Sequence, residues 1–154
     1  MRKSTAKTKL LLKALILVLS AVFCLFMPVM TGAGLIYNRT SYGGRLAFTG
    51  VLFIVSAVLM TVGAVLCGGG KKRKNVLSVI FSLSGFLLCM VMLRKLCLHA
   101  DVSGWSDKFT MEQISRMYQR RLLPCAVPVA MAVIMSLLHI SAPKEETGKY
   151  TSIL

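Results

Sequence analysis

The sequence has few acidic residues, and it lacks charge inside its long apolar stretches. Lys and Arg number 19, whereas Asp and Glu number five. No Asp, Glu, Lys, Arg or His lies in the middle of any long apolar run. Proton relays, ion-coupled transporters and intramembrane enzymes depend on ionisable residues at such positions. The sequence therefore argues against these three classes.

The five cysteines lack paired spacing. They are scattered along the chain and no CxxC motif occurs, which argues against a disulfide scaffold. One disulfide stays open as an alternative, because Cys97 and Cys125 both fall near the same predicted membrane face. We expect no catalytic residue, no metal site and no cofactor.

Two weak groupings bear on that expectation. Cys97, His99 and Asp101 offer donors for a soft metal ion or an activated thiol, but their spacing matches no established motif, and a structural role is favoured. Met131 and Met135 are separated by three residues, a gap that resembles the methionine pair of copper-transporter pores. Thioethers bind Cu(I), yet methionine is also an ordinary filler of core gaps, and we expect packing.

Four long uncharged runs dominate what is present. They cover 14–37, 46–70, 75–93 and 122–143, with lengths of 24, 25, 19 and 22 residues. A helix that crosses a bilayer needs about 20 predominantly apolar residues. We therefore predict an all-α integral membrane protein, an up-down bundle of four transmembrane helices. The predicted spans are about 14–37, 46–69, 75–97 and 122–142, within a membrane domain 14–143 between a basic N-terminus 1–13 and a polar tail 144–154.

The net charge of +14 is concentrated where the apolar runs end. There it fits anionic lipid headgroups, and it fits nucleic acid poorly because no nucleic-acid-binding motif accompanies it. The densest group follows three glycines and comprises Lys71, Lys72, Arg73 and Lys74. Cations of this kind stay cytoplasmic, which predicts a multi-pass protein of the cell membrane, with a bacterial plasma membrane favoured, and both termini inside. A cleaved signal peptide is the alternative for the first span, although its apolar run is long for one.

Small residues form stripes on two predicted helices. In the third, Ser78, Ser82 and Gly85 recur on one face, and in the fourth Ala126 and Ala130 are four apart. Small side chains let helix backbones approach closely in lipid. We predict helix–helix contacts at these five positions, with a substrate groove as the alternative.

The second outer connection contains a predicted short amphipathic helix, TMEQISRMYQRRL. A helix with one apolar and one basic face lies in the headgroup plane, and aromatic rings favour the same depth. The segment either anchors the connection in the interface or docks a partner protein. The residues that we expect to serve this role are Trp105, Met111, Ile114, Met117 and Tyr118.

These patterns favour a non-catalytic protein. We expect an accessory, assembly or regulatory subunit that binds other membrane proteins, or itself, through helix–helix and interfacial-helix contacts. The alternative is a small oligomeric transporter or pore component, with selectivity from hydroxyl and backbone groups. An enzyme that uses the outer cysteine, histidine and acids is the least favoured class.

Overall fold

The structure is a computed structural model that describes residues 2–42, 44–102, 116, 120 and 122–141. In these residues it is all helical, and four helices are long and apolar enough to cross a membrane: Lys7–Tyr37, Gly44–Leu66, Lys72–His99 and Leu123–Ser141. The prediction of an all-helical chain with four helices of spanning length is thus confirmed. Of the predicted amphipathic helix only residues 116, 120 and 122 are described, and the five residues expected to lie in the interface are outside the described part of the chain.

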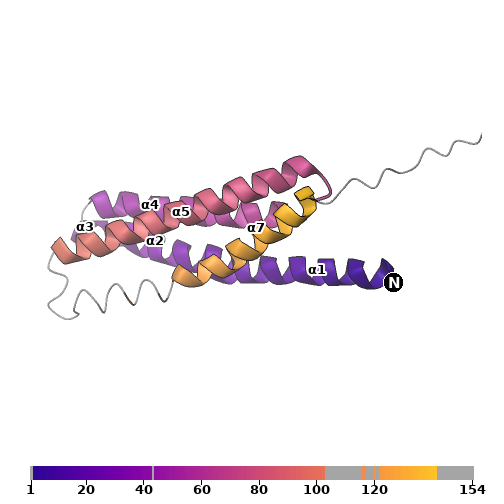
Figure 1. The fold of residues 1–154 in the computed structure, drawn as a ribbon. Coiled ribbons are helices and arrows are strands. Elements are labelled where there is room, and N and C mark those ends of the chain that lie inside the picture. Colours follow the sequence, from indigo (N-terminus) through magenta and orange to yellow (C-terminus); the bar gives the residue numbers. More distant parts are fainter. Residues whose placement is uncertain (1, 43, 103–115, 117–119, 121, 142–154) are drawn as a thin grey trace, which may run out of the picture.

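The first span belongs to a helix that is longer than its apolar run. This helix consists of α1 (Arg2–Leu19), a π-helical segment η1 (Ser20–Phe26) and α2 (Met27–Tyr37), which follow one another without a break. The basic N-terminus is therefore helical from Arg2 onward. Figure 1 shows its first turns extending beyond the other helices at the end of the molecule where the N-terminus lies.

The next two helices form a hairpin. After the short α3 (Arg39–Tyr42), α4 (Gly44–Leu66) runs back along α2, and α5 (Lys72–Val102) runs back along α4. The predicted second span ends at about residue 69, and α4 ends at Leu66, just before the three glycines of the turn. Gly68 has φ +66°, a left-handed conformation that glycine adopts without a steric cost.

The basic group lies partly inside a helix. Only Lys71 belongs to the turn, whereas Lys72, Arg73 and Lys74 form the first turn of α5, and all four are exposed. Cations are unfavourable next to the positive end of a helix dipole. Hydrogen bonds to the turn hold the segment there, because the Asn75 side-chain amide donates to the Gly69 carbonyl at 2.8 Å.

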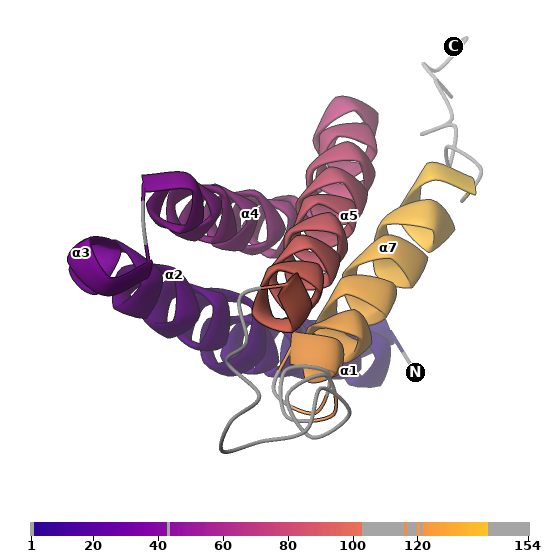
Figure 2. The ribbon, with the colours of Figure 1, turned by 90° about the vertical axis from the view of Figure 1, so that its left-hand side faces the viewer.

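The last helix closes the bundle. A short 3₁₀ turn η3 (Leu123–Cys125) leads into α7 (Ala126–Ser141), which packs against α5 and returns to the end where the N-terminus lies. Seen along the bundle, α2, α4, α5 and α7 surround one shared interior, with α1 beneath α7 (Figure 2). Most buried apolar residues form a cluster from the middle of this interior to the α3 end, and a smaller cluster around Ile16 and Ala64 lies between α1, α4 and α7.

Candidate functional site

The closest contact between α4 and α5 occurs at two glycines. A Cβ atom added to Gly63 would collide with the Ser82 side chain and would lie 2.8 Å from the Ser82 backbone nitrogen. A Cβ atom on Gly85 would lie 2.8 Å from the backbone nitrogen of Met60. Only glycine permits these approaches, since real Cβ atoms do not come this close to backbone atoms. The predicted stripe Ser78, Ser82 and Gly85 thus lies buried in the α4–α5 contact.

A buried chain of hydroxyl groups joins three helices. The Ser78 hydroxyl on α5 donates to the Gly63 carbonyl on α4 at 2.6 Å. The Ser136 hydroxyl on α7 donates to the Ser78 hydroxyl at 3.0 Å. Both serines are fully buried. Polar side chains that bond across helices stabilise association inside a bilayer, where water does not compete.

The fourth helix buries small residues besides the predicted ones. Ala126 is half-buried and Ala130 is exposed, whereas Ala132 is buried in the smaller cluster. Ala132 and Ser136 are four apart and lie on the inner face of α7. Ala130 lies two residues before Ala132, and a shift of two residues turns a side chain by more than half of a helical turn. The rotation of α7 thus directs Ala130 outward.

A third close contact joins α2 and α4 and was not predicted. A Cβ atom on Gly50 would lie 2.6 Å from the Gly32 carbonyl oxygen, and a Cβ atom on Gly32 would collide with the Gly50 carbonyl. A periodic signal for α4 is present in the sequence. Small residues recur there every seven positions, at Gly50, Ala57 and Ala64, and all three are buried. This heptad spacing is typical of a helix that packs in a left-handed bundle.

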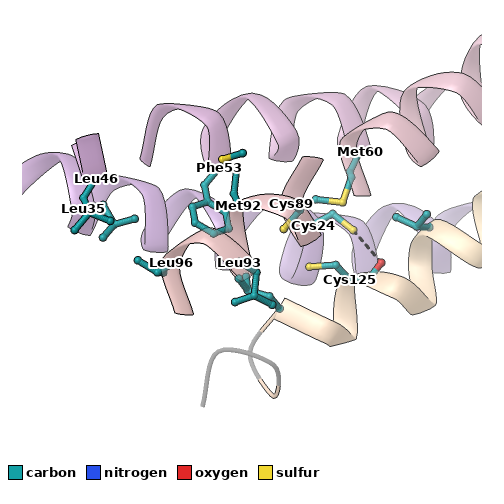
Figure 3. Packing of buried hydrophobic residues seen from close by; sticks show 12 residues of the cluster. Cys24, Leu35, Leu46, Phe53, Met60, Cys89, Met92, Leu93, Leu96 and Cys125 are labelled. Atoms are coloured by element: carbon teal, nitrogen blue, oxygen red, sulfur yellow. Dashed lines mark hydrogen bonds between the residues drawn. The ribbon is translucent and has the colours of Figure 1, made fainter. Parts of the chain in front are cut away.

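Two thiols connect the first and last helices. The Cys125 thiol donates to the Phe23 carbonyl at 2.8 Å, and the Cys24 thiol donates to the Cys125 carbonyl at 3.6 Å. Figure 3 shows Cys24 and Cys125 side by side near Cys89 and Met60. Cys97 and Cys125, both described, are not joined by a disulfide. The disulfide alternative is therefore not realised, because the Cys125 side chain points to the first helix.

Pro28 explains why the Phe23 carbonyl accepts a thiol. In the π-helical segment each N–H bonds to the carbonyl five residues earlier, and five residues after Phe23 comes Pro28, which has no N–H. The Phe23 carbonyl therefore loses its helical donor. The Cys125 thiol replaces that donor. The π-helical segment of the first span is thereby hydrogen-bonded to the start of the last span.

The remaining predicted groupings show no ligand geometry. Among the described residues, no group of three or more His, Cys, Asp or Glu side chains is placed to hold a metal ion. Met135 is buried, and its terminal methyl packs against Gly68, where an added Cβ would lie 2.5 Å away. Met131 packs against the same small cluster. Both methionines thus contribute to packing between α7 and its neighbours.

The arrangement as a whole is a set of packing contacts between helices. Glycine, serine and cysteine bring the backbones together, and their polar atoms are satisfied mainly by carbonyls of neighbouring turns or helices. No protein-family model, curated protein or solved structure matches the chain.

Proposed function

We propose that the chain is an integral membrane protein that acts as a non-catalytic accessory, assembly or regulatory subunit and binds another membrane protein or a second copy of itself. The observation that carries the proposal is the slight burial of the first span. In its most apolar window 17% of the residues are buried, against 44% in α4. The residues it buries follow one another at intervals of four, four, four, four and three, in a single stripe: Ile16, Ser20, Cys24, Pro28, Gly32 and Leu35.

Uncovered apolar surface alone fits lipid, so the small residues on that surface favour a protein partner. Ala14 and Ala21 are exposed and seven positions apart on the first span, and Ala130 is exposed on α7. Small side chains allow a second backbone to approach, which lipid tails do not require. We therefore propose that Ala130 packs against another chain and not against a helix of its own chain.

The buried polar chemistry also fits a packing role. Ser56 donates to the Phe53 carbonyl at 2.7 Å, and Ser78 and Ser136 form the hydroxyl chain between helices. Catalysis by proton transfer needs a titratable group within reach of a substrate. The described buried polar and charged residues are hydroxyls and one amide: Ser20, Thr49, Ser56, Asn75, Ser78, Ser82 and Ser136.

Membrane orientation follows from the distribution of cations. The start of the first span and the turn before α5 lie at the same end of the bundle (Figure 1). Lys7, Lys9, Lys13 and the group 71–74 are thus gathered at that end. The positive-inside rule places such an end in the cytoplasm, and a bacterial plasma membrane, with anionic headgroups, is the membrane that we propose.

The test is a pull-down of the tagged full chain from its native membrane in a mild detergent, with the molar mass of the complex measured by light scattering. We expect a stoichiometric membrane-protein partner or a defined oligomer. A large side chain at an exposed alanine, Ala21→Trp or Ala130→Trp, should abolish the complex. The matched control is Leu87→Trp, which enlarges an exposed side chain on α5.

Two outcomes contradict the proposal. If the chain is isolated from the native membrane as a monomer without a partner, it is not a subunit. If it forms a homo-oligomer that conducts ions when reconstituted in liposomes, it is a pore and not an accessory subunit.

A further inference from the structure

The end of the bundle that carries the N-terminus has a groove between α1 and α7. It has a volume of about 320 Å³, near the lower limit of ligand sites, which span about 300–1,000 Å³. Its lining is apolar except at two residues, Lys9 and His139. The apolar part of the lining consists of Leu12, Met131, Ile134, Met135 and Leu138.

The two basic residues lie at the same end of this groove. Lys9 is near the start of the first span, Lys7–Tyr37, and His139 is near the end of the last span, Leu123–Ser141. Along the length of the bundle, both lie toward the end that carries the N-terminus (Figure 1). Met131 is eight residues before His139 in α7, a distance of about 12 Å along a helix that rises about 1.5 Å per residue. The groove therefore runs from a basic end at the bundle surface toward an apolar end inside the spans.

The imidazole is oriented by a hydrogen bond. His139 Nδ1 lies 2.8 Å from the Met135 carbonyl oxygen, and since a carbonyl only accepts, Nδ1 carries the proton. The other ring nitrogen, Nε2, then carries a lone pair and accepts, so it does not donate to a phosphate oxygen. The Lys9 ammonium, which has three donors, therefore supplies the polar contacts to an anion at the mouth of the groove.

We propose that this groove holds one anionic phospholipid, with its phosphate at Lys9, at the end of the groove where His139 lies, and an acyl chain along Ile134, Met135 and Met131. Charge complementarity and the change from basic to apolar along the groove carry the assignment. The inference rests on the proposed residence in a membrane and is independent of the subunit role. It also differs from general attraction of cations to headgroups, because it assigns one binding position.

The first test is native mass spectrometry of the full chain in an uncharged detergent, titrated with phosphatidylglycerol or with phosphatidylcholine. We expect a single phosphatidylglycerol molecule to bind more tightly than phosphatidylcholine. Lys9→Gln should weaken phosphatidylglycerol binding about fivefold, since one cation near anionic lipid contributes about 1 kcal/mol. Lys72→Gln removes the same charge from an exposed lysine outside the groove and should leave binding unchanged.

A second pair of variants tests the apolar part of the site. Leu138→Trp fills the groove and should abolish binding, whereas Leu137→Trp alters an exposed neighbour that does not line it. Equal loss in both variants, equal affinity for the two lipids, or equal effects of Lys9→Gln and Lys72→Gln would overturn the assignment. An oligomer that dissociates only in Leu138→Trp would also overturn it, because a second copy would then occupy the groove.

These results are separate from the pull-down. A partner that still binds Leu138→Trp leaves the subunit role standing when the lipid site fails. Specific phosphatidylglycerol binding by a chain without any partner supports the lipid site while the subunit role fails.

Discussion

At the scale of single residues, the tightest packing occurs where a glycine faces a serine or a backbone atom of the next helix. Gly63 faces Ser82, and Gly85 faces the backbone of Met60. In lipid no hydrophobic drive brings helices together, so close backbone approach and the resulting dispersion contacts replace it. At each glycine in such a contact, one added carbon atom would overpack the interface and lower the stability of the bundle.

Replacement of Gly63 by alanine should destabilise the bundle by about 1–3 kcal/mol, the usual cost of overpacking. The added methyl would collide with Ser82. Gly34→Ala is the matched control, because nothing lies within 4 Å of its added Cβ. Unfolding in mixed micelles measures both changes. Equal stability of the two variants would contradict the close contact.

The hydroxyl chain makes a separate prediction. Ser78→Ala removes both interhelical hydrogen bonds and should cost about 1–2 kcal/mol, since such bonds in membranes average about 0.6 kcal/mol each and reach about 1.7. Ser84→Ala removes a hydroxyl that bonds only to the Phe81 carbonyl of its own helix. It should have little effect in the same unfolding measurement. Equal losses would show that the hydroxyl chain does not join the helices.

At the scale of elements, the first span remains helical on both sides of a proline. Pro28 is the second residue of α2, which follows the π-helical segment directly. The predicted first span, 14–37, extends past this proline, and the helix continues to Tyr37. The π register and the Cys125 thiol together accommodate the missing N–H, and they couple the first span to the last.

A double-mutant cycle tests this coupling. Cys125→Ala should cost about 1–3 kcal/mol, because it leaves the Phe23 carbonyl without a donor. Pro28→Ala restores an N–H, so Cys125→Ala should cost less in that background. Cys125→Ser keeps a donor and should be milder than the alanine variant. Additive losses, measured by unfolding in mixed micelles, would show that the thiol and the proline act independently.

At the scale of the whole molecule, charge is distributed unequally between the two ends. The basic group 71–74 and the lysines of the first turns lie at the end that carries the N-terminus, and the end of α7 lies there too (Figure 1). These cations lie together at one end of the bundle, and the positive-inside rule predicts that such an end faces the cytoplasm. The predicted orientation, with both termini in the cytoplasm, stays a prediction.

Labelling of introduced cysteines tests the orientation. In intact bacterial cells a membrane-impermeant maleimide should label Thr40→Cys, which is exposed in α3, and should leave Lys72→Cys unlabelled until the cells are permeabilised. The native chain, whose five cysteines are buried or half-buried, provides the background. Labelling in the opposite order would reverse the proposed topology.

The sequence predicts the helices better than their contacts. Each long uncharged run corresponds to a helix of spanning length, because the length of an apolar run is a local property. Gly32 and Gly50 were missed, and Ala130 lies outward, because a contact depends on the rotation of two helices. The Cys125–Phe23 bond joins residues 102 positions apart, and no local pattern connects them.

The amino-acid sequence alone thus specifies four apolar helices, their order and the position of the cations, since each of these depends on a single segment. Only the packed bundle shows which glycine faces which serine, which thiol bonds to the carbonyl left without a donor by Pro28, and that a groove with a basic mouth opens between α1 and α7. Such contacts require two helices at one separation and one rotation. Both are set by packing of the whole bundle.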